Sequence, residues 1–262
     1  MKFIAHYSSS AGNLYCVTAA NGKRLLIDPG VTWAKLQKAL NYDFTNIEGC
    51  LLTHEHKDHS KAVEDVLKAG IDVYASAGTI KALGVLHRKA HIIRDKEGFL
   101  INDGFRVFPF EVNHDAAEPM GFVIGEIWYV AGNQERLLFV TDTSHIKQKF
   151  GVAFSIIAIC CGYDVAVLRQ REASGDIDPS LAKRLLTSHM EQETTKAYIR
   201  DQCCTDKLTE IHLLHCSRDN LDAEKVRSEI EAEFFTKTYI AGQAAKASLP
   251  LGPSRLLLLK IE

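Results

Sequence analysis

The chain has 262 residues, of which 46% are hydrophobic and 24% are charged, and its formal net charge at pH 7 is −2. These values are ordinary for a soluble globular protein and allow one large domain or two small ones. The near-neutral charge neither favours nor excludes a nucleic-acid partner. No apolar run approaches the length of a membrane-spanning helix, so we expect no membrane partner.

The cysteines are odd in number and include two adjacent pairs, but no C-x-x-C spacing. They are Cys16, Cys50, Cys160, Cys161, Cys203, Cys204 and Cys216. This pattern excludes a disulfide framework, and most of these residues fall in apolar runs that are typical of reduced core thiols. The first residues lack the long apolar core of a signal peptide. We therefore expect a cytoplasmic protein.

The first half of the chain is predicted to be rich in antiparallel strands, with helices between some of them. Asn21-Gly22 and Asn102-Asp103-Gly104 are strong hairpin signals, and a third hairpin is expected around Gly132-Asn133. The predicted strands are 2–6, 14–19, 24–28, 49–53, 72–75, 99–101, 105–113, 121–130 and 136–141. Helical apolar spacing covers residues 33–40, 62–69 and 79–86.

The second half repeats this style, with buried strands separated by helices. Strands are predicted at 155–160, 211–214 and 239–240, and helices at 179–186, 191–202 and 222–234. Two strand-rich halves flanked by helices indicate an α/β sandwich with two mixed sheets inside and helices outside. Without a linker between the halves, residues 1–241 are predicted to form one domain. The tail, 242–262, is predicted to be an edge strand, a partner contact or disordered.

The chemically most informative stretch is Leu51–Ser60, which holds His54, His56, Asp58 and His59 within six positions. A short apolar strand precedes it and a helical pattern follows, so these side chains should converge at the end of a strand. Imidazole and carboxylate groups are the usual ligands of zinc and similar divalent ions. The spacing therefore predicts a metal site.

Three more ligand candidates follow apolar strands, namely His114, Asp142 and His215. Residues at that position lie where a rigid scaffold opens into a loop. The seven candidates are too many for one tetrahedral ion and predict two. One group would be His54, His56 and His114, the other would be Asp58, His59 and His215, and Asp142 would bridge them. Zinc is the first choice of metal, with manganese or iron as alternatives.

At this point a family resemblance is visible. His54-Glu-His-Lys-Asp-His59 resembles the H-x-H-x-D-H signature of the metallo-β-lactamase superfamily, and Leu25–Gly30 is similar to its first motif. His114, Asp142 and His215 match the third to fifth motifs in order. The resemblance implies an αββα sandwich, the metallo-β-lactamase fold. It also implies that Asp28 orients the histidine loop without binding metal.

A finer similarity is to the YycJ/WalJ-like branch of that superfamily, which is related to the ribonuclease Z-type phosphodiesterases. Ser8–Leu14, His114–Phe122 and Thr141–Thr143 carry it. One departure is visible, because Ile159–Asp164 lacks the glutamate that the branch has there. The carboxylate at Asp142 is typical of phosphoesterases and thioesterases, whereas β-lactamases tend to use cysteine or histidine at that position.

The resemblance implies further site residues. His189 is spaced like a histidine that touches the scissile phosphate and can supply a proton to the leaving oxygen, although a helix-capping loop would also fit. Asp58 would bind metal and orient the nucleophile. Substrate contacts are expected from Asn13, Tyr163, Arg218 and Asn220. Arg218 could hold phosphate or form a surface ion pair, and the loop of Asn13 could be a plain tight turn.

The resulting functional hypothesis is a dinuclear, metal-dependent phosphodiesterase that uses a metal-bridging hydroxide as nucleophile. A nuclease acting on DNA comes first, and a cyclic-nucleotide phosphodiesterase, whose pocket the second subunit of a homodimer would complete, comes second. A thioesterase or lactonase would share the ligands but should lack a working His189. An iron oxidoreductase and a non-catalytic binding protein are further alternatives. The complete ligand set argues against the last.

Overall fold

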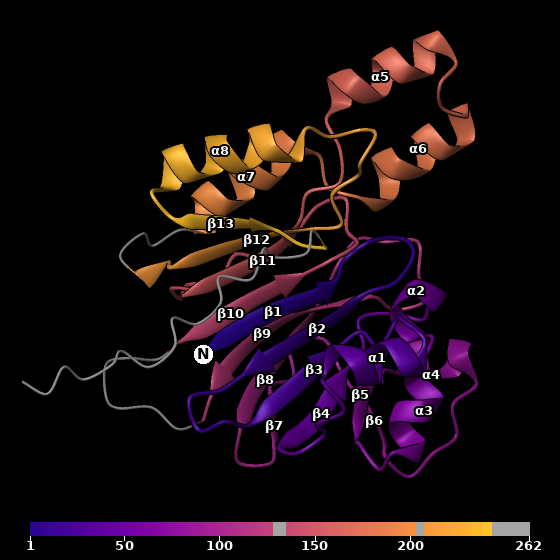
Figure 1. Ribbon diagram of the computed structural model, residues 1–262, viewed down its shortest axis with the longest axis vertical. Coiled ribbons are helices and arrows are strands. Elements are labelled where there is room, and N and C mark those ends of the chain that lie inside the picture. The colour runs from indigo at the N-terminus through magenta and orange to yellow at the C-terminus, as the bar shows by residue number, and fades with distance from the viewer. Residues whose placement is uncertain (128–134, 203–206, 243–262) are drawn as a thin grey trace, which may run out of the picture.

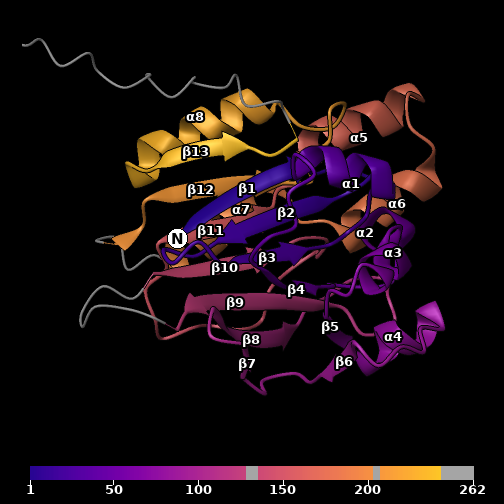
Figure 2. The same cartoon turned by 60° about the horizontal axis from the view of Figure 1, so that its bottom comes forward.

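The computed structural model describes residues 1–127, 135–202 and 207–242. Two β-sheets face each other, and helices cover their outer surfaces (Figures 1 and 2). This arrangement confirms the predicted sandwich of two mixed sheets flanked by helices. The hairpin expected around Gly132-Asn133 and nearly all of the tail lie outside the described residues.

The first sheet has six strands in the order β1-β2-β3-β4-β5-β6. The first two pairings are antiparallel and the other three are parallel. Gly22, at the tip of the β2–β3 hairpin, has a φ of +80°, which an Asn-Gly turn accommodates without steric cost. The strands are β1 (Lys2–Tyr7), β2 (Leu14–Thr18), β3 (Arg24–Ile27), β4 (Ile47–Leu51), β5 (Val73–Ser76) and β6 (Ala90–Ile93).

The second sheet has seven strands in the order β13-β12-β11-β10-β9-β8-β7. The strands from β10 to β13 are parallel, and those from β7 to β10 are antiparallel. Their bounds are β7 (Phe99–Ile101), β8 (Phe105–Glu111), β9 (Met120–Glu126), β10 (Arg136–Val140), β11 (Ile156–Cys160), β12 (Glu210–Leu214) and β13 (Lys237–Ile240).

The core lies between the sheets, where Tyr15, Leu25, Phe122 and Phe139 are fully buried side by side. The outer face of the first sheet packs against the helices α1 (Trp33–Ala39) and α3 (Val63–Lys68), with α2 (Lys57–Ser60) and α4 (Ala77–Leu83) at the same end. The outer face of the second sheet packs against α7 (Gln192–Gln202) and α8 (Ala223–Phe234).

A helical hairpin, α5 (Val165–Ser174) and α6 (Pro179–Ser188), stands out from one end of the sandwich (Figure 1). Sequence patterning predicted α6 but missed α5, because only Leu168 of α5 is buried and the helix therefore carries no apolar stripe. Its ends are nevertheless encoded, since Asp164 caps the first turn and Gly175 closes the helix in the left-handed conformation. Strand β6 and the one-turn helix α2 were also missed.

The structure bears on the state of the cysteines and on the presence of membrane-spanning helices. The five cysteines in the described part of the chain are free thiols, which agrees with the absence of a disulfide framework. None of the helices that the structure describes is long and apolar enough to cross a membrane.

Candidate active site

All seven predicted metal ligands lie just beyond the carboxyl ends of strands at one end of the sandwich. His54 and His56 follow β4, and His114, Asp142 and His215 follow β8, β10 and β12 respectively. Asp58 and His59 lie in α2, a short helix that begins within the cluster where a loop was predicted. The two sheets therefore contribute ligands from opposite sides of their shared core.

Asp28 holds in place the segment that carries His54, His56 and His59. Its carboxylate accepts hydrogen bonds from the Thr53 backbone N–H at 2.8 Å and from the Thr53 hydroxyl at 2.9 Å. Oδ2 also lies 2.8 Å from His59 Nδ1, and Asp28 is fully buried. A buried carboxylate on one ring nitrogen fixes the orientation of the imidazole and directs the other nitrogen into the site.

Gly30 allows the two loops of the site to pack closely. A Cβ at this position would lie 1.7 Å from the Asp58 carbonyl oxygen, which excludes every other amino acid in this backbone arrangement. The Gly30 N–H donates to the Asn13 carbonyl at 2.8 Å. The Asp28-Pro29-Gly30 turn thus fixes the position of the ligand-bearing helix α2.

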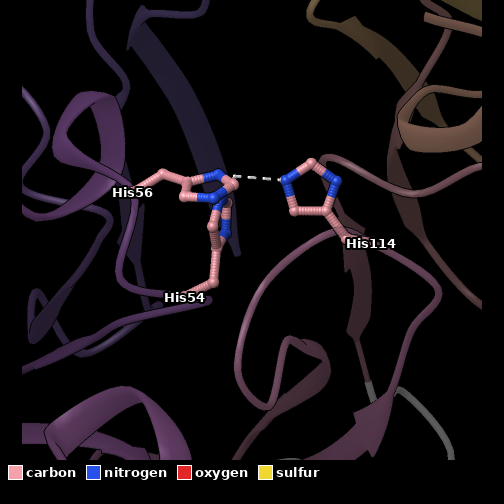
Figure 3. A group of neighbouring side chains, drawn as sticks. All are labelled: His54, His56 and His114. Atoms are coloured by element: carbon pink, nitrogen blue, oxygen red, sulfur yellow. Dashed lines mark hydrogen bonds between the residues drawn. The ribbon is translucent and has the colours of Figure 1, made fainter. Parts of the chain in front are cut away.

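The first ligand group consists of His54, His56 and His114, whose rings converge from β4 and β8 (Figure 3). One nitrogen of each lies within 4.8 Å of the others, and His56 Nδ1 is 3.2 Å from His114 Nε2. Burial lowers the pKa of His54 well below its ordinary value and also lowers the pKa of His114. These two imidazoles are therefore neutral, as metal binding requires.

The second ligand group consists of Asp58, His59, Asp142 and His215. His59 Nε2 lies 3.2 Å from Asp142 and 3.4 Å from Asp58, and His215 Nε2 lies 3.5 Å from Asp142. Burial disfavours a charged His59, but the carboxylates of Asp142 and Asp28 prevail and raise its pKa well above the ordinary value. His59 therefore holds a proton that His54 and His114 lack.

Asp142 faces both groups, because its carboxylate also lies 3.9 Å from His114 Nε2. The Thr141 hydroxyl donates to Asp142 Oδ1 at 2.9 Å and restricts its rotation. The position of Asp142 supports the predicted bridging role.

Both groups fit divalent ions by an independent criterion. His54 Nε2 and His215 Nε2 are buried, point into the first and second groups respectively, and form no hydrogen bond. An unsatisfied buried polar atom costs about 1–3 kcal/mol, which coordination to a metal would offset. Three imidazoles in one group, and two imidazoles with two carboxylates in the other, are donor sets that zinc, manganese or iron accept.

His189 lies above the second group, at the carboxyl end of α6. Its ring stacks on His215 with centroids 4.8 Å apart, and its centroid is 6.2 Å from that of His114. Nδ1 lies 3.9 Å from the thiol of Cys160, in the stretch that departs from the glutamate-containing pattern. A Cβ on Gly162 would lie 2.7 Å from His189 Cβ, so this glycine makes room for the histidine.

A cleft of 1220 Å³ opens above both ligand groups. Its floor includes ligands from both groups and His189, and one wall comes from the α5–α6 hairpin. The opposite walls are the 8–11 loop and the segment after His215. Arginine and acidic side chains both line it, namely Arg184, Arg218, Asp219, Asp222 and Glu224. The hairpin wall was not predicted, because α5 itself was missed.

Of the four predicted substrate contacts, the structure places only Arg218 on the cleft wall. Asn13 is fully buried, and its amide donates to the backbone carbonyls of Ser9 and Asp58, so it supports the ligand loop where a substrate contact was expected. Tyr163 is 5% exposed and packs under the α5–α6 hairpin. Asn220 is 6% exposed and accepts a hydrogen bond from Arg171.

Sequence reasoning also missed supporting residues, chiefly Ser8, Tyr15 and Thr53. Each places a hydroxyl among apolar neighbours near a ligand. Thr53 could have been found by its position, because it is the polar residue that ends a buried run immediately before His54. Tyr15 gives no such signal, since a tyrosine in a strand is normally read as core.

Comparisons with known proteins agree with this geometry. Exodeoxyribonuclease YycJ of Bacillus anthracis is 29% identical over 260 residues, with 93% of each chain covered. Exodeoxyribonuclease WalJ of Streptococcus pneumoniae is 27% identical over 239 residues, which cover 84% of this chain and 82% of that protein. The crystal structure of the metallo-β-lactamase fold protein YhfI from Bacillus subtilis superposes with a TM-score of 0.67, at 14% identity and with 92% and 96% coverage.

The family whose pattern matches is described as the beta-lactamase superfamily domain, and the match spans residues 23–209. This span holds six of the seven candidate ligands, and it leaves out only His215. Because the match covers well over half of the sequence, the chain belongs to the beta-lactamase superfamily.

Proposed function

We propose that this protein is a metal-dependent phosphodiesterase that acts on DNA as an exonuclease and uses two divalent ions. The observation that carries the proposal is the convergence of seven imidazole and carboxylate side chains, in two groups, on the floor of one open cleft. The names of the two curated relatives supply the expected substrate class. Zinc is the first choice of metal, with manganese or iron as alternatives.

The candidate ligands would hold the ions and orient the attacking water. Bound ions at the two groups would lower the pKa of a water molecule and neutralise negative charge on phosphoryl oxygens. Asp142 faces both groups and would hold them in a fixed relation. Asp58 belongs to the second group and lines the cleft, so its carboxylate can also orient the attacking water.

His189 is positioned to act on the leaving group. Burial lowers the pKa of His189 to about 4, so the imidazole is neutral near neutral pH. With Nδ1 next to the buried Cys160 thiol, Nε2 is the nitrogen left for substrate. We assign to it a hydrogen bond to the leaving oxygen, which weakens the bond to phosphorus as charge develops there.

The size of the cleft favours a nucleic acid over a cyclic mononucleotide. Small-molecule pockets usually measure about 300–1,000 Å³, and this cleft is larger and open to solvent. The charges on its walls are mixed, and Arg184 is paired with Asp115. The cleft is therefore not a long basic groove, and a single strand entering end-on fits it better than a duplex lying across it.

A substrate panel tests the proposal. Metal-loaded protein would be assayed with bis-p-nitrophenyl phosphate, single- and double-stranded DNA, RNA, cyclic mononucleotides and a thioester. We expect turnover of bis-p-nitrophenyl phosphate and release of nucleotides from the ends of DNA. Exclusive cleavage of the thioester would overturn the proposal, and exclusive cleavage of a cyclic mononucleotide would replace DNA as the substrate.

A further inference from the structure

A chain of hydrogen bonds connects His215 with Asp58, two members of the second ligand group. The residues between them, Ser8, Tyr15 and Asn13, are not candidate ligands. The chain of hydrogen bonds begins at the backbone N–H of His215, which donates to Ser8 Oγ at 3.0 Å. Ser8 Oγ lies 2.8 Å from the Tyr15 hydroxyl, and that hydroxyl donates to Asn13 Oδ1 at 3.0 Å. The Asn13 amide then donates to the Asp58 carbonyl at 3.1 Å.

Each group in this chain has a single consistent role. The Tyr15 proton is committed to Asn13, so Tyr15 can only accept from Ser8, and Ser8 in turn accepts from His215. Tyr15 and Asn13 are 0% exposed and Ser8 is 5% exposed, so water does not compete for these positions. Buried hydrogen-bond networks that are fully satisfied fix one arrangement of the groups they join.

The backbone of His215, where this chain of hydrogen bonds begins, needs to be held in place by its neighbours. His215 has a φ of +55°, a conformation that residues with a side chain seldom adopt. Strained backbone of this kind persists only when neighbouring groups hold it. The Ser8 hydroxyl supplies that hold. Gly242, two residues beyond β13, in turn lies so close to the Ser8 backbone that an added Cβ would meet the Ser8 carbonyl oxygen at 2.9 Å.

We propose that Tyr15 is a positioning residue for the second ligand group, acting through Ser8 on His215 and through Asn13 on Asp58. The inference deepens the proposed function and rests on its two-ion site. His54 and His114 of the first group are hydrogen-bonded to the Thr53 hydroxyl and the Ser188 carbonyl, neither of which belongs to this chain of hydrogen bonds. The link from the chain to His54 is indirect, because it runs through His59, Asp28 and Thr53. Loss of the Tyr15 hydroxyl should therefore weaken one ion and spare the other.

The test is a titration of metal-free protein with Co²⁺. Calorimetry measures the affinity for each equivalent, and the visible spectrum reports the coordination of the bound ion. Tyr15→Phe keeps the aromatic ring, which packs in the core against Phe139 with ring centroids 5.0 Å apart. We expect the affinity for one of two equivalents to fall by about 10–100-fold, with an altered spectrum for that ion, while the other is unchanged. Ser8→Ala should weaken the same equivalent. His114→Ala should weaken the equivalent that Tyr15→Phe spares.

A matched control separates this effect from a general loss of packing. Tyr198→Phe also removes a partly buried hydroxyl, one that donates to the Gln148 carbonyl at 3.0 Å, but this residue lies on α7 away from both groups. This variant should bind both equivalents as the wild type does. Unchanged binding of both equivalents by Tyr15→Phe, or equal weakening of both, would overturn the inference alone. Fewer than two equivalents in the wild type would overturn the two-ion site and this inference with it.

Discussion

The two ligand groups contain similar side chains but differ in the charges around their imidazoles and therefore in the pKa values of their histidines. The first is three imidazoles, two of them with lowered pKa values, and one of its buried nitrogens has no hydrogen-bond partner. The second alternates imidazole with carboxylate, so that His59 is surrounded by Asp28, Asp58 and Asp142. Each group holds one buried nitrogen without a hydrogen-bond partner, on His54 in the first and on His215 in the second, but only the second also retains a proton on His59.

Two neighbouring sites of this kind would differ in what an incoming ion has to displace. An ion entering either group would satisfy an orphaned nitrogen, but one entering the first group would displace no proton from His54 or His114. An ion entering the second group must displace the proton of His59, because coordination requires a deprotonated imidazole. The first ion should therefore bind more readily, and binding of the second should depend on pH.

The most severe test of the comparison is Gly30→Ala, which acts on the second group through the backbone. The added Cβ would meet the Asp58 carbonyl at 1.7 Å, so helix α2 must move or the chain must fail to fold. We expect loss of the second ion, of essentially all activity and of several degrees in Tm. Tm and metal content measure this. Gly151→Ala, where an added Cβ meets no atom within 4 Å, is the control. Normal Tm and metal content in Gly30→Ala would contradict the packing described.

Removal of the shared carboxylate comes next in size. Asp142→Ala takes a ligand from the second group and a neighbour from the first, so both ions should be weakened and turnover should fall by more than about 100-fold. His114→Ala takes a ligand from the first group alone and should weaken only one ion. Metal content after dialysis distinguishes the two variants. If both variants lose the same single ion, Asp142 does not serve both groups.

His189→Ala should separate chemistry from metal binding. The imidazole stacks on His215 without belonging to either group, so both ions should remain. Removal of a hydrogen-bond donor to developing charge typically costs about 10²–10³-fold in rate, and we expect kcat for a phosphodiester to fall in that range. His91→Ala, on β6 away from the site, is the control. Undiminished phosphodiester turnover by His189→Ala would remove the proposed role.

The smallest expected effect, and the one that sharpens the comparison most directly, is pH dependence. The pKa of His59 is raised, so below that pKa each unit of falling pH should weaken the second ion by about tenfold. The pKa values of His54 and His114 are lowered, so these two side chains should add no such slope for the first ion over the same interval. Metal titrations between about pH 6 and about pH 8 measure both slopes. Parallel slopes for the two ions would show that the groups do not differ in this way.

The convergence of the candidate ligands was predictable because His54, His114, Asp142 and His215 each follow an apolar run. The strand before His54, and those before His114, Asp142 and His215, were each recognisable from buried residues, and strand ends gather at one edge of a sheet. The same logic failed for helix α5, whose single buried residue leaves no periodic pattern, and the wall that it gives the cleft was missed with it.

Substrate contacts were harder to predict than ligands for a different reason. Asn13 and Asn220 have side chains that suit either a ligand or the protein's own backbone, and residue type alone does not say which of the two they meet. In the fold both side chains are buried and bind protein groups. Asn13 accepts a hydrogen bond from the Tyr15 hydroxyl, and Asn220 accepts one from the Arg171 guanidinium. Arg218 carries a charge that burial would penalise, and it lies on the surface of the cleft as predicted.

The hydrogen bond from His215 to Ser8 joins residues that are 207 positions apart in the sequence. The first ligand group is complete once residue 114 has been synthesised, but the second needs β12, which ends at Leu214. During translation, the residues of the second group can therefore come together only after most of the chain has been synthesised. On the function proposed above, a chain that ends before β12 would lack one of the two ion sites and with it the nuclease activity.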